Sequence, residues 1–365
     1  LNSPQVFAAL VHKFIDHGWK MIFTIRTVYK DSFCNILLKD IAYDEFRVES
    51  IADEVLEAIS EQYHFPLPQN QNLRSLLKDF FYLKLYLKLD PAGLDLVSSE
   101  ELFLQQVWKE VICDSHRRAE NLPVRREEMV THIVFSMLQR GSTIYISSAN
   151  DDYMALTALE DSGIIAVYDN SPRRWMMSHD VYEELIIKHI LTQRYQEGIE
   201  AEKVLEGFGL SLRARKLYRI WLESVFASGG GRYADFLISM LQSGLDQAWK
   251  DETLIALMQS DQVDCFRAID PILSQERYSL FTRMVFLLNT ACRDIDRELL
   301  KKLSTPTGNK YRFTCPVGRA WFTVFQYIYN NRGLIPWTAQ NLDIVTNTLK
   351  TWTAKYETGE TTGLA

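Results

Sequence analysis

The chain contains little cysteine. It has five such residues among 365, and no two are spaced as CxxC: Cys34, Cys113, Cys265, Cys292 and Cys315. An odd number of scattered cysteines argues against a disulfide framework, and the lack of pairs argues against a zinc site. The seven histidines show no metal-ligand spacing among themselves or with the cysteines. We therefore expect reduced, buried thiols, as is usual in the cytosol, and no metal site.

Long apolar runs are also missing. No stretch approaches the ~18 consecutive apolar residues of a membrane span, and the longest runs are interrupted by charge. The first residues, Leu1-Asn2-Ser3-Pro4, lack the basic and apolar regions of a signal peptide. We therefore expect a cytoplasmic protein with no membrane partner. Because the sequence also lacks an initiator Met, we interpret it as a piece of a longer chain.

Several catalytic motifs are absent. The sequence has no GxxxxGK[ST], GxGxxG, GxSxG or HExxH, and the glycine cluster at 229–231 leads to no Lys-Ser/Thr pair and is interpreted as a loop. Lys and Arg number 40 against 47 Asp and Glu, which gives a net charge of −7. No overall field therefore attracts nucleic acid or an anionic membrane, although a local basic patch remains open.

The chain is rich in hydrophobic residues, and these recur with helical periodicity. Hydrophobic residues make up 47% and aromatic residues 12%, which excludes a disordered chain, and the length suits two or three domains. Apolar residues recur at helical spacing through most of the first 140 residues. The pattern predicts a mainly α fold, with helices over 4–18, 51–59, 73–87, 99–115 and 126–140.

One early segment differs from this pattern. Trp19–Ile25 is a nearly continuous apolar run, which is typical of a strand covered on both faces of a parallel sheet. It delivers Thr24 and then Arg26 to its C-terminal end, where open α/β sheets bind ligands. Arginine suits a terminal phosphate there, because its planar fork engages two oxygens. The alternative is a surface arginine that merely ends a strand.

The block from 141 to 190 has an informative order of elements. A short strand at 144–146 and a helix at 151–162 precede two apolar strands, 164–168 and 174–177, which a turn at 169–172 joins. A helix at 181–193 follows. This order predicts a winged helix. His179 and Asp180 stand at the start of the last helix, where Asp180 alone would be an ordinary N-terminal cap.

The sequence pattern predicts a series of consecutive helices over the remainder of the chain, from about 198 to 365. No strict repeat period is present, so irregular pairs of the HEAT or armadillo type fit better than a tetratricopeptide array. The predicted helices span 212–226, 233–242, 247–258, 262–272, 277–292, 317–330 and 342–356.

These features together resemble the STAND class of signalling P-loop NTPases, which includes NACHT, AP-ATPase and prokaryotic antiviral (Avs-type) proteins. The matching order is a strand ending in Thr-Ile-Arg, a helical lid, a winged helix that closes on a His-Asp pair, and a helical array. The resemblance implies a C-terminal edge of an α/β NTPase core at 1–45, a lid at 46–95, a winged-helix domain at 96–195 and a helical sensor at 196–365.

The resemblance also implies a nucleotide site for ATP and ADP. Arg26 matches the sensor-1 arginine that contacts the terminal phosphate, and His179 matches the histidine that contacts the β-phosphate of ADP, with Asp180 as its partner. Phe80 stands where the family usually carries a proline against adenine, so Phe81 or Tyr82 would stack instead. The phosphate loop and the Mg²⁺ ligands would precede Leu1, so this segment alone would not be catalytic, although the full-length protein would be an ATPase.

The function that the resemblance implies is an ATP-dependent switch in antiviral, anti-phage defence. The winged helix would read the nucleotide state, and the helical region, with exposed Trp321, Trp337 and Trp352, would bind a foreign protein and support oligomerisation. Core packing is the alternative for these tryptophans.

Two other functions remain open. One is a winged-helix regulator that binds nucleic acid, but the helix at 150–162 carries four acidic and no basic residues. The other stretch that could contact nucleic acid is the basic segment Leu210–Arg219, for which the alternative is a solvated helix face. The other is a helical protein-interaction adaptor without nucleotide.

Overall fold

The computed structural model is mainly helical, which confirms the predicted fold class at that level. It describes residues 4–23, 44, 50–90, 94, 97–117, 119–169, 171–228, 232–260, 266, 269, 271–273, 279–295, 314–316, 318–333, 335 and 337–356. The chain divides into two units, Leu1–Leu56 and Glu57–Ala365. The domain boundaries given above stay predictions. Every helix in the described ranges is too short or too polar to cross a lipid bilayer.

In the first unit, the predicted helix is confirmed and the predicted strand is not. Helix α1 (Pro4–Asp16) is followed by Gly18, whose φ of +79° is a left-handed conformation that favours glycine. The next residues, Trp19–Phe23, form no strand, and Ile22 is 94% exposed. An apolar run becomes a buried strand only beside hydrogen-bonded neighbours, and the described residues of Leu1–Leu56 include no strand. Thr24 and Arg26 lie outside the described residues.

The segment expected to be one helix over 73–87 is two helices. Helix α3 (Asp53–Tyr63) is followed by α4 (Gln71–Leu76) and α5 (Phe80–Tyr86). The break arises because Asp79 caps α5: its Oδ1 accepts a hydrogen bond of 2.7 Å from the N–H of Phe81. Asn70 caps α4 in the same way. The prediction of a single helix was therefore wrong, and Phe81 lies in the first turn of α5.

A buried arginine anchors the next helices. Helix α7 (Glu100–Val107) continues as a π-helix, η2 (Trp108–Ile112), and after a short 3-10 turn, η3 (Ala119–Asn121), the chain enters α8 (Leu122–Arg140). Arg126 is fully buried in α8, and its guanidinium donates to the carbonyls of Val111, Ile112 and Ala158 at 2.9–3.1 Å. The hydrogen bonds satisfy the buried polar group and join the end of η2 to α8 and to the helix that follows.

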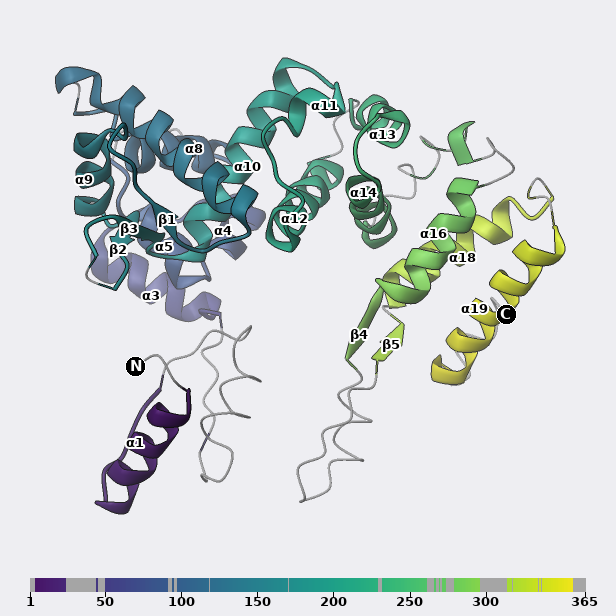
Figure 1. Cartoon of the computed structure of the whole chain (residues 1–365), viewed down its shortest axis with the longest axis horizontal. Helices are drawn as coiled ribbons and strands as arrows, with labels where there is room; N and C mark the ends of the chain where they lie inside the picture. The colour runs from purple at the N-terminus through teal and green to yellow at the C-terminus, as the bar shows by residue number, and fades with distance from the viewer. Residues whose placement is uncertain are drawn as a thin grey trace. The chain divides into compact units, whose positions relative to one another are not determined.

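A small antiparallel sheet follows α8 (Figure 1). The sheet consists of β1 (Tyr145–Ile146), β2 (Ile165–Val167) and β3 (Arg174–Met177). Helix α9 (Tyr153–Asp161) connects β1 to β2 in the chain, and α10 (Asp180–Glu197) follows β3. The strand order is β1-β3-β2, with Tyr145 opposite Trp175 and Val167 also opposite Trp175. The predicted hairpin of two short strands is confirmed, and it delivers the chain directly to the start of α10.

The rest of the described chain is a series of helices that pack on their neighbours. They are α11 (Ala201–Val204), α12 (Leu212–Ser228), α13 (Tyr233–Gln242), α14 (Gln247–Gln259), α16 (Ser279–Thr290), α18 (Gly318–Asn330) and α19 (Ala339–Tyr356). A short hairpin of β4 (Arg293–Ile295) and β5 (Thr314–Pro316), which the sequence pattern did not predict, lies between α16 and α18. Helix α10 packs on α12, α12 on α14, and α14 on α16.

The three tryptophans expected to be exposed on the helical region differ in their exposure to solvent. Trp321 is fully buried, and its indole N–H donates to the carbonyl of Cys292 at 3.0 Å, so the prediction of exposure was wrong for this residue. Its place on the inner face of α18 explains the burial, because apolar spacing alone does not say which face of an aromatic-rich helix meets the core. Trp337 is 42% exposed, as expected. The side chain of Trp352 lies outside the described part of the chain.

Candidate functional site

His179 occupies the N-cap of α10, at the point where the hairpin ends. Its backbone is extended, with φ −148° and ψ 142°, and its Nδ1 accepts a hydrogen bond of 3.2 Å from the N–H of Val181. The prediction that Asp180 is the cap was wrong, because Asp180 is the first helical residue. Accepting through Nδ1 places the proton of a neutral imidazole on Nε2. The cap therefore fixes both the orientation and the tautomer of His179.

Phe81 covers one face of the His179 ring. The two ring centroids are 4.2 Å apart with an interplanar angle of 22°, a stacked arrangement. Tyr182, one turn into α10, packs edge-on against Phe81 at 5.0 Å and 80°. Two of the predicted site residues, far apart in the sequence, are thus brought into direct contact. Aromatic pairs of this kind contribute about 0.5–1.5 kcal/mol beyond the burial of area.

Tyr82 lies beside this cluster in an acidic environment. Its ring is 6.2 Å from that of Phe81, in an edge-on arrangement. Burial raises the pKa of the Tyr82 phenol, and the nearby carboxylates of Glu184, Asp79 and Glu100 raise it further. The phenol is therefore neutral at pH 7, and the surrounding carboxylates disfavour a phosphate close to Tyr82, while its ring remains suited to stacking. The neighbouring Phe80 is 56% exposed and takes no part in the cluster.

Tyr182 and the buried carboxylate that follows it were not predicted from the sequence. Glu183 is 1% exposed and pairs with Arg213 of α12. The signal for Tyr182 was its place on the same face of α10 as His179, three residues on, where side chains of a helix are neighbours. No local signal marks Glu183, since a glutamate in the first turn of a helix is ordinarily solvated. These residues join the N-terminus of α10 to α5 on one side and to α12 on the other.

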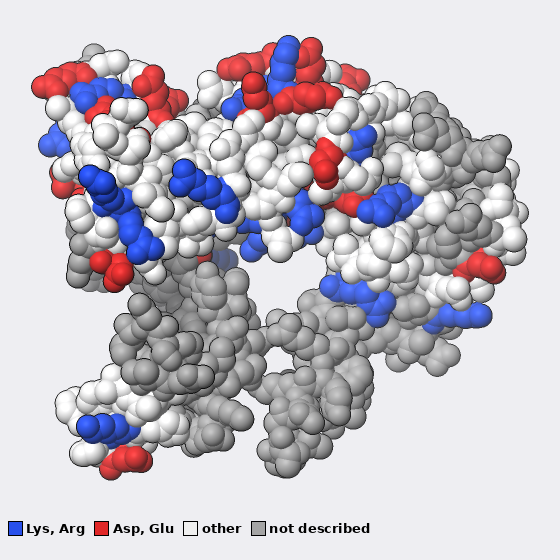
Figure 2. All heavy atoms as spheres, in the orientation of Figure 1, with Lys and Arg blue, Asp and Glu red and all other residues white. Residues whose placement is uncertain are grey.

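The basic stretch Leu210–Arg219 is engaged with acidic partners. Besides the pair between Arg213 and Glu183, Arg215 and Arg219 lie 3.7 and 3.4 Å from the carboxylate of Glu252 in α14. The interpretation of this stretch as a solvated helix face was therefore wrong for its three arginines, whereas Lys216 is exposed. On the face that Figure 2 draws, basic and acidic side chains of the described residues are interspersed rather than gathered into a basic surface.

Helix α9 is likewise poorly suited to contact phosphates. Its N-cap, Asp152, binds Arg125 through both carboxylate oxygens at 2.5 and 2.6 Å, and these contacts lower the pKa of the Asp152 carboxyl. Asp151 accepts hydrogen bonds from Tyr145 and Ser148. The helix itself, Tyr153–Asp161, contains no Lys or Arg. The face that a DNA-binding winged helix would present is therefore acidic.

Two of the cysteines are buried thiols. Cys113 and Cys292 are free and buried, and burial raises the pKa of each thiol to about 12, so both are protonated at neutral pH. Among the residues that the structure describes, no group of three or more His, Cys, Asp or Glu side chains is placed to hold a metal ion.

The chain was also compared with known proteins. Comparison with models of protein families finds no match, and comparison with curated proteins finds no similar sequence.

Proposed function

We propose that this chain is part of an ATP-dependent signalling switch of the STAND class, in which His179 reports the nucleotide state. The observation that carries the proposal is the contact between His179 and Phe81. The resemblance assigns His179 to the β-phosphate of ADP, and it places Phe81 in the segment that contacts adenine. The folded chain brings these two positions together at the N-terminus of a long helix, where backbone N–H groups favour an anion.

The order of elements supports the winged-helix part of the proposal. The strand order β1-β3-β2, the helix α9 between β1 and β2, and the hairpin that leads into α10 are the arrangement expected of a winged helix. His179 follows the hairpin directly, as the resemblance requires. The engaged arginines of α12 and the acidic α9 argue against the alternative of a nucleic-acid-binding regulator.

The residues near α10 fit part of a nucleotide. The Nε2–H of His179 is a hydrogen-bond donor suited to a phosphate oxygen. Phe81 is engaged with His179 and Tyr182, so we assign it to positioning His179 and leave Tyr82 as the ring for adenine. The cation for the terminal phosphate would be Arg26. The magnesium ligands would lie outside this chain.

The helical region would bind the trigger, a foreign protein such as a phage protein, and support assembly into a homo-oligomer. The exposed group that suits this role is Tyr329, Arg332 and Trp337. The Arg332 guanidinium lies 4.6 Å from the centroid of the Tyr329 ring, and the indole N–H of Trp337 donates to the Arg332 carbonyl at 2.8 Å. Tyrosine, arginine and tryptophan dominate the binding energy of protein interfaces.

The test uses the full-length protein purified without added nucleotide. Bound nucleotide is released by denaturation and quantified by anion-exchange chromatography, and the oligomeric state is measured in parallel. We expect the wild type to retain ADP as a resting protein, and His179→Ala to lose most of it and to assemble without a trigger. His116→Ala, which removes an exposed histidine, is the matched control and should behave as wild type. Retention of ADP and a resting state in both His179→Ala and Arg26→Ala would refute the proposal and favour the adaptor.

A further inference from the structure

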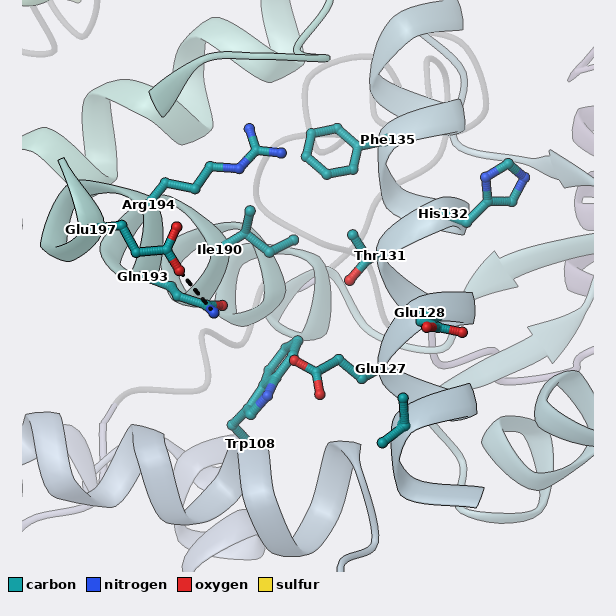
Figure 3. Close-up of a pocket in the computed structure, with 11 residues that line it drawn as sticks. Trp108, Glu127, Glu128, Thr131, His132, Phe135, Ile190, Gln193, Arg194 and Glu197 are labelled. Carbon is teal, nitrogen blue, oxygen red and sulfur yellow. Dashed lines mark hydrogen bonds between the residues drawn. The ribbon is translucent and has the colours of Figure 1, made fainter. Parts of the chain in front are cut away.

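A cleft of about 660 Å³ lies between η2, α8 and the C-terminal part of α10 (Figure 3). This volume is within the range of small-molecule sites. Trp108, Phe135 and Ile190 give the cleft apolar walls, and Thr131 adds a hydroxyl. His179 precedes Ile190 by eleven residues of the same helix, about 16 Å at 1.5 Å per residue. The cleft is therefore separate from the proposed nucleotide site.

Carboxylates enter the cleft from two different helices. Glu127 extends from α8 toward Trp108, whereas Glu197 comes from the last turn of α10 and accepts a hydrogen bond of 3.4 Å from the amide of Gln193 (Figure 3). Glu128 also borders the cleft from α8. Three carboxylates thus line a space whose walls also include apolar side chains.

The one guanidinium or ammonium group that borders the cleft, that of Arg194, is already bound within the described structure. It donates to the carbonyls of Val204 and Glu206 at 3.2 and 2.6 Å, and it lies 5.1 Å from the centroid of the Phe135 ring. These contacts hold the guanidinium against α8 and the end of α11. Its single charge leaves the lining with a surplus of negative charge.

Trp108 forms an aromatic wall of the cleft, and the histidine stacked on it adds no positive charge. Its indole is stacked on His189, with centroids 3.8 Å apart and an interplanar angle of 12°. Burial lowers the pKa of His189 to about 4, so the imidazole is neutral at pH 7. An indole ring attracts organic cations through its quadrupole, and a neutral imidazole behind it does not oppose that attraction.

We propose that this cleft binds a small alkyl polyamine. Carboxylates on two walls would each accept one ammonium group, and the methylenes between the ammonium groups would lie against Ile190, Phe135 and Trp108. A lysine side chain of another protein offers the same ammonium chemistry, but it carries one charge where the cleft has carboxylates on two helices. The free polyamine therefore matches the cleft better.

The test follows the Trp108 signal in the whole chain labelled with 5-fluorotryptophan, by ¹⁹F NMR, with the Trp108 resonance assigned from Trp108→Phe. The probe is 1,4-diaminobutane. We expect a saturable shift of that resonance, and an affinity that falls as NaCl is raised, because the contacts are charged. In Glu127→Gln/Glu197→Gln the affinity should fall at least about tenfold, since hydrogen bonds to charged groups are the strong ones. Glu160→Gln, on the surface of α9, is the matched control and should bind as wild type.

Two comparison ligands make the outcome decisive. Butane-1,4-diol has the same chain length without charge and should give no saturable shift. Nα-acetyl-lysine N-methylamide has one ammonium group and should bind more weakly than the diamine. The proposal is overturned by an absent shift with the diamine, an equal shift with the diol, tighter binding of the lysine derivative, or unchanged affinity in the double variant. If that variant does not fold, the NaCl titration on the wild type decides the question, because salt-insensitive binding excludes carboxylate contacts.

Discussion

The ion pair between Glu183 and Arg213 gives a prediction whose sign can be worked out from burial. Glu183 is 1% exposed and Arg213 is 25% exposed, and the pair joins α10 to α12. Arg213→Met leaves a buried carboxylate without its guanidinium, so the free energy of unfolding should fall by about 3–5 kcal/mol. The N-terminus of α10 still favours the carboxylate, which places the loss toward the lower end of that range.

The other two variants of a double-mutant cycle on this pair should lose less stability than Arg213→Met. Glu183→Leu leaves the charge of Arg213, which reaches solvent, so we expect the free energy of unfolding to fall by only about 1–2 kcal/mol. The double variant Glu183→Leu/Arg213→Met removes both charges and replaces them with side chains of similar volume. Its stability should lie within about 1 kcal/mol of the wild type. The double variant should thus be more stable than Arg213→Met alone.

The assay is urea denaturation followed by circular dichroism at 222 nm, with the midpoint and slope compared across the four proteins. Arg173→Met, in the exposed turn before β3, is the control for loss of an arginine and should stay within about 0.5 kcal/mol of the wild type. If Arg213→Met and Arg173→Met lose the same small amount, or if the double variant loses the sum of the two single variants, the reasoning from burial fails.

Three further predictions concern single sites. Because burial lowers the folded-state pKa of His189 from 6.5 to about 4, its contribution to stability should be complete above about pH 6.5 and decline as the pH falls toward 4. Denaturation midpoints at pH 7.5 and 5 should differ less in His189→Gln than in the wild type. Cys113 and Cys292 should resist iodoacetamide at pH 8 in the native protein and react in urea, as read by peptide mass spectrometry, since burial raises both pKa values to about 12. Asp79→Ala should lower the free energy of unfolding by about 1 kcal/mol through loss of the α5 cap, whereas Asp79→Asn should keep most of it.

The helices could be predicted because their evidence is local. The apolar residues that recur at helical spacing in α8, namely Met129, Ile133, Val134, Met137 and Leu138, are all buried. The hairpin of β2 and β3 was predicted for the same reason, since two short apolar runs flank a turn. Failures occurred where a local signal competed with periodicity. Asp79 caps α5 and divides the helix that the leucine pattern predicted.

The rest of the site depends on contacts between segments distant in the chain. Nothing in the neighbourhood of Phe81 or His179 specifies that the two rings stack, and nothing near Glu183 specifies a partner in α12. The apolar run Trp19–Phe23 shows the converse error: composition predicted a buried strand, but burial of a strand requires neighbours that its own sequence cannot supply. The β4–β5 hairpin was missed because Arg293–Ile295 and Thr314–Pro316 show no alternation of apolar and polar residues.

Helix α10 connects the proposed nucleotide site, the ion pair with α12 and the cleft. His179 caps its start, Glu183 pairs with α12, and Glu197 in its last turn borders the cleft. Buried residues recur on several sides of this helix, as in a core helix: Tyr182, Glu183, Leu185, Ile186, Ile187, Ile190 and Leu191. In the proposed switch, the pair between Glu183 and Arg213 is the contact that would carry a change at His179 to the helical region. Spatial continuity is not coupling, and the two are separated by measuring ADP retention in the full-length Arg213→Met protein. Retention equal to that of Arg173→Met would show that this pair stabilises the fold without transmitting the nucleotide state.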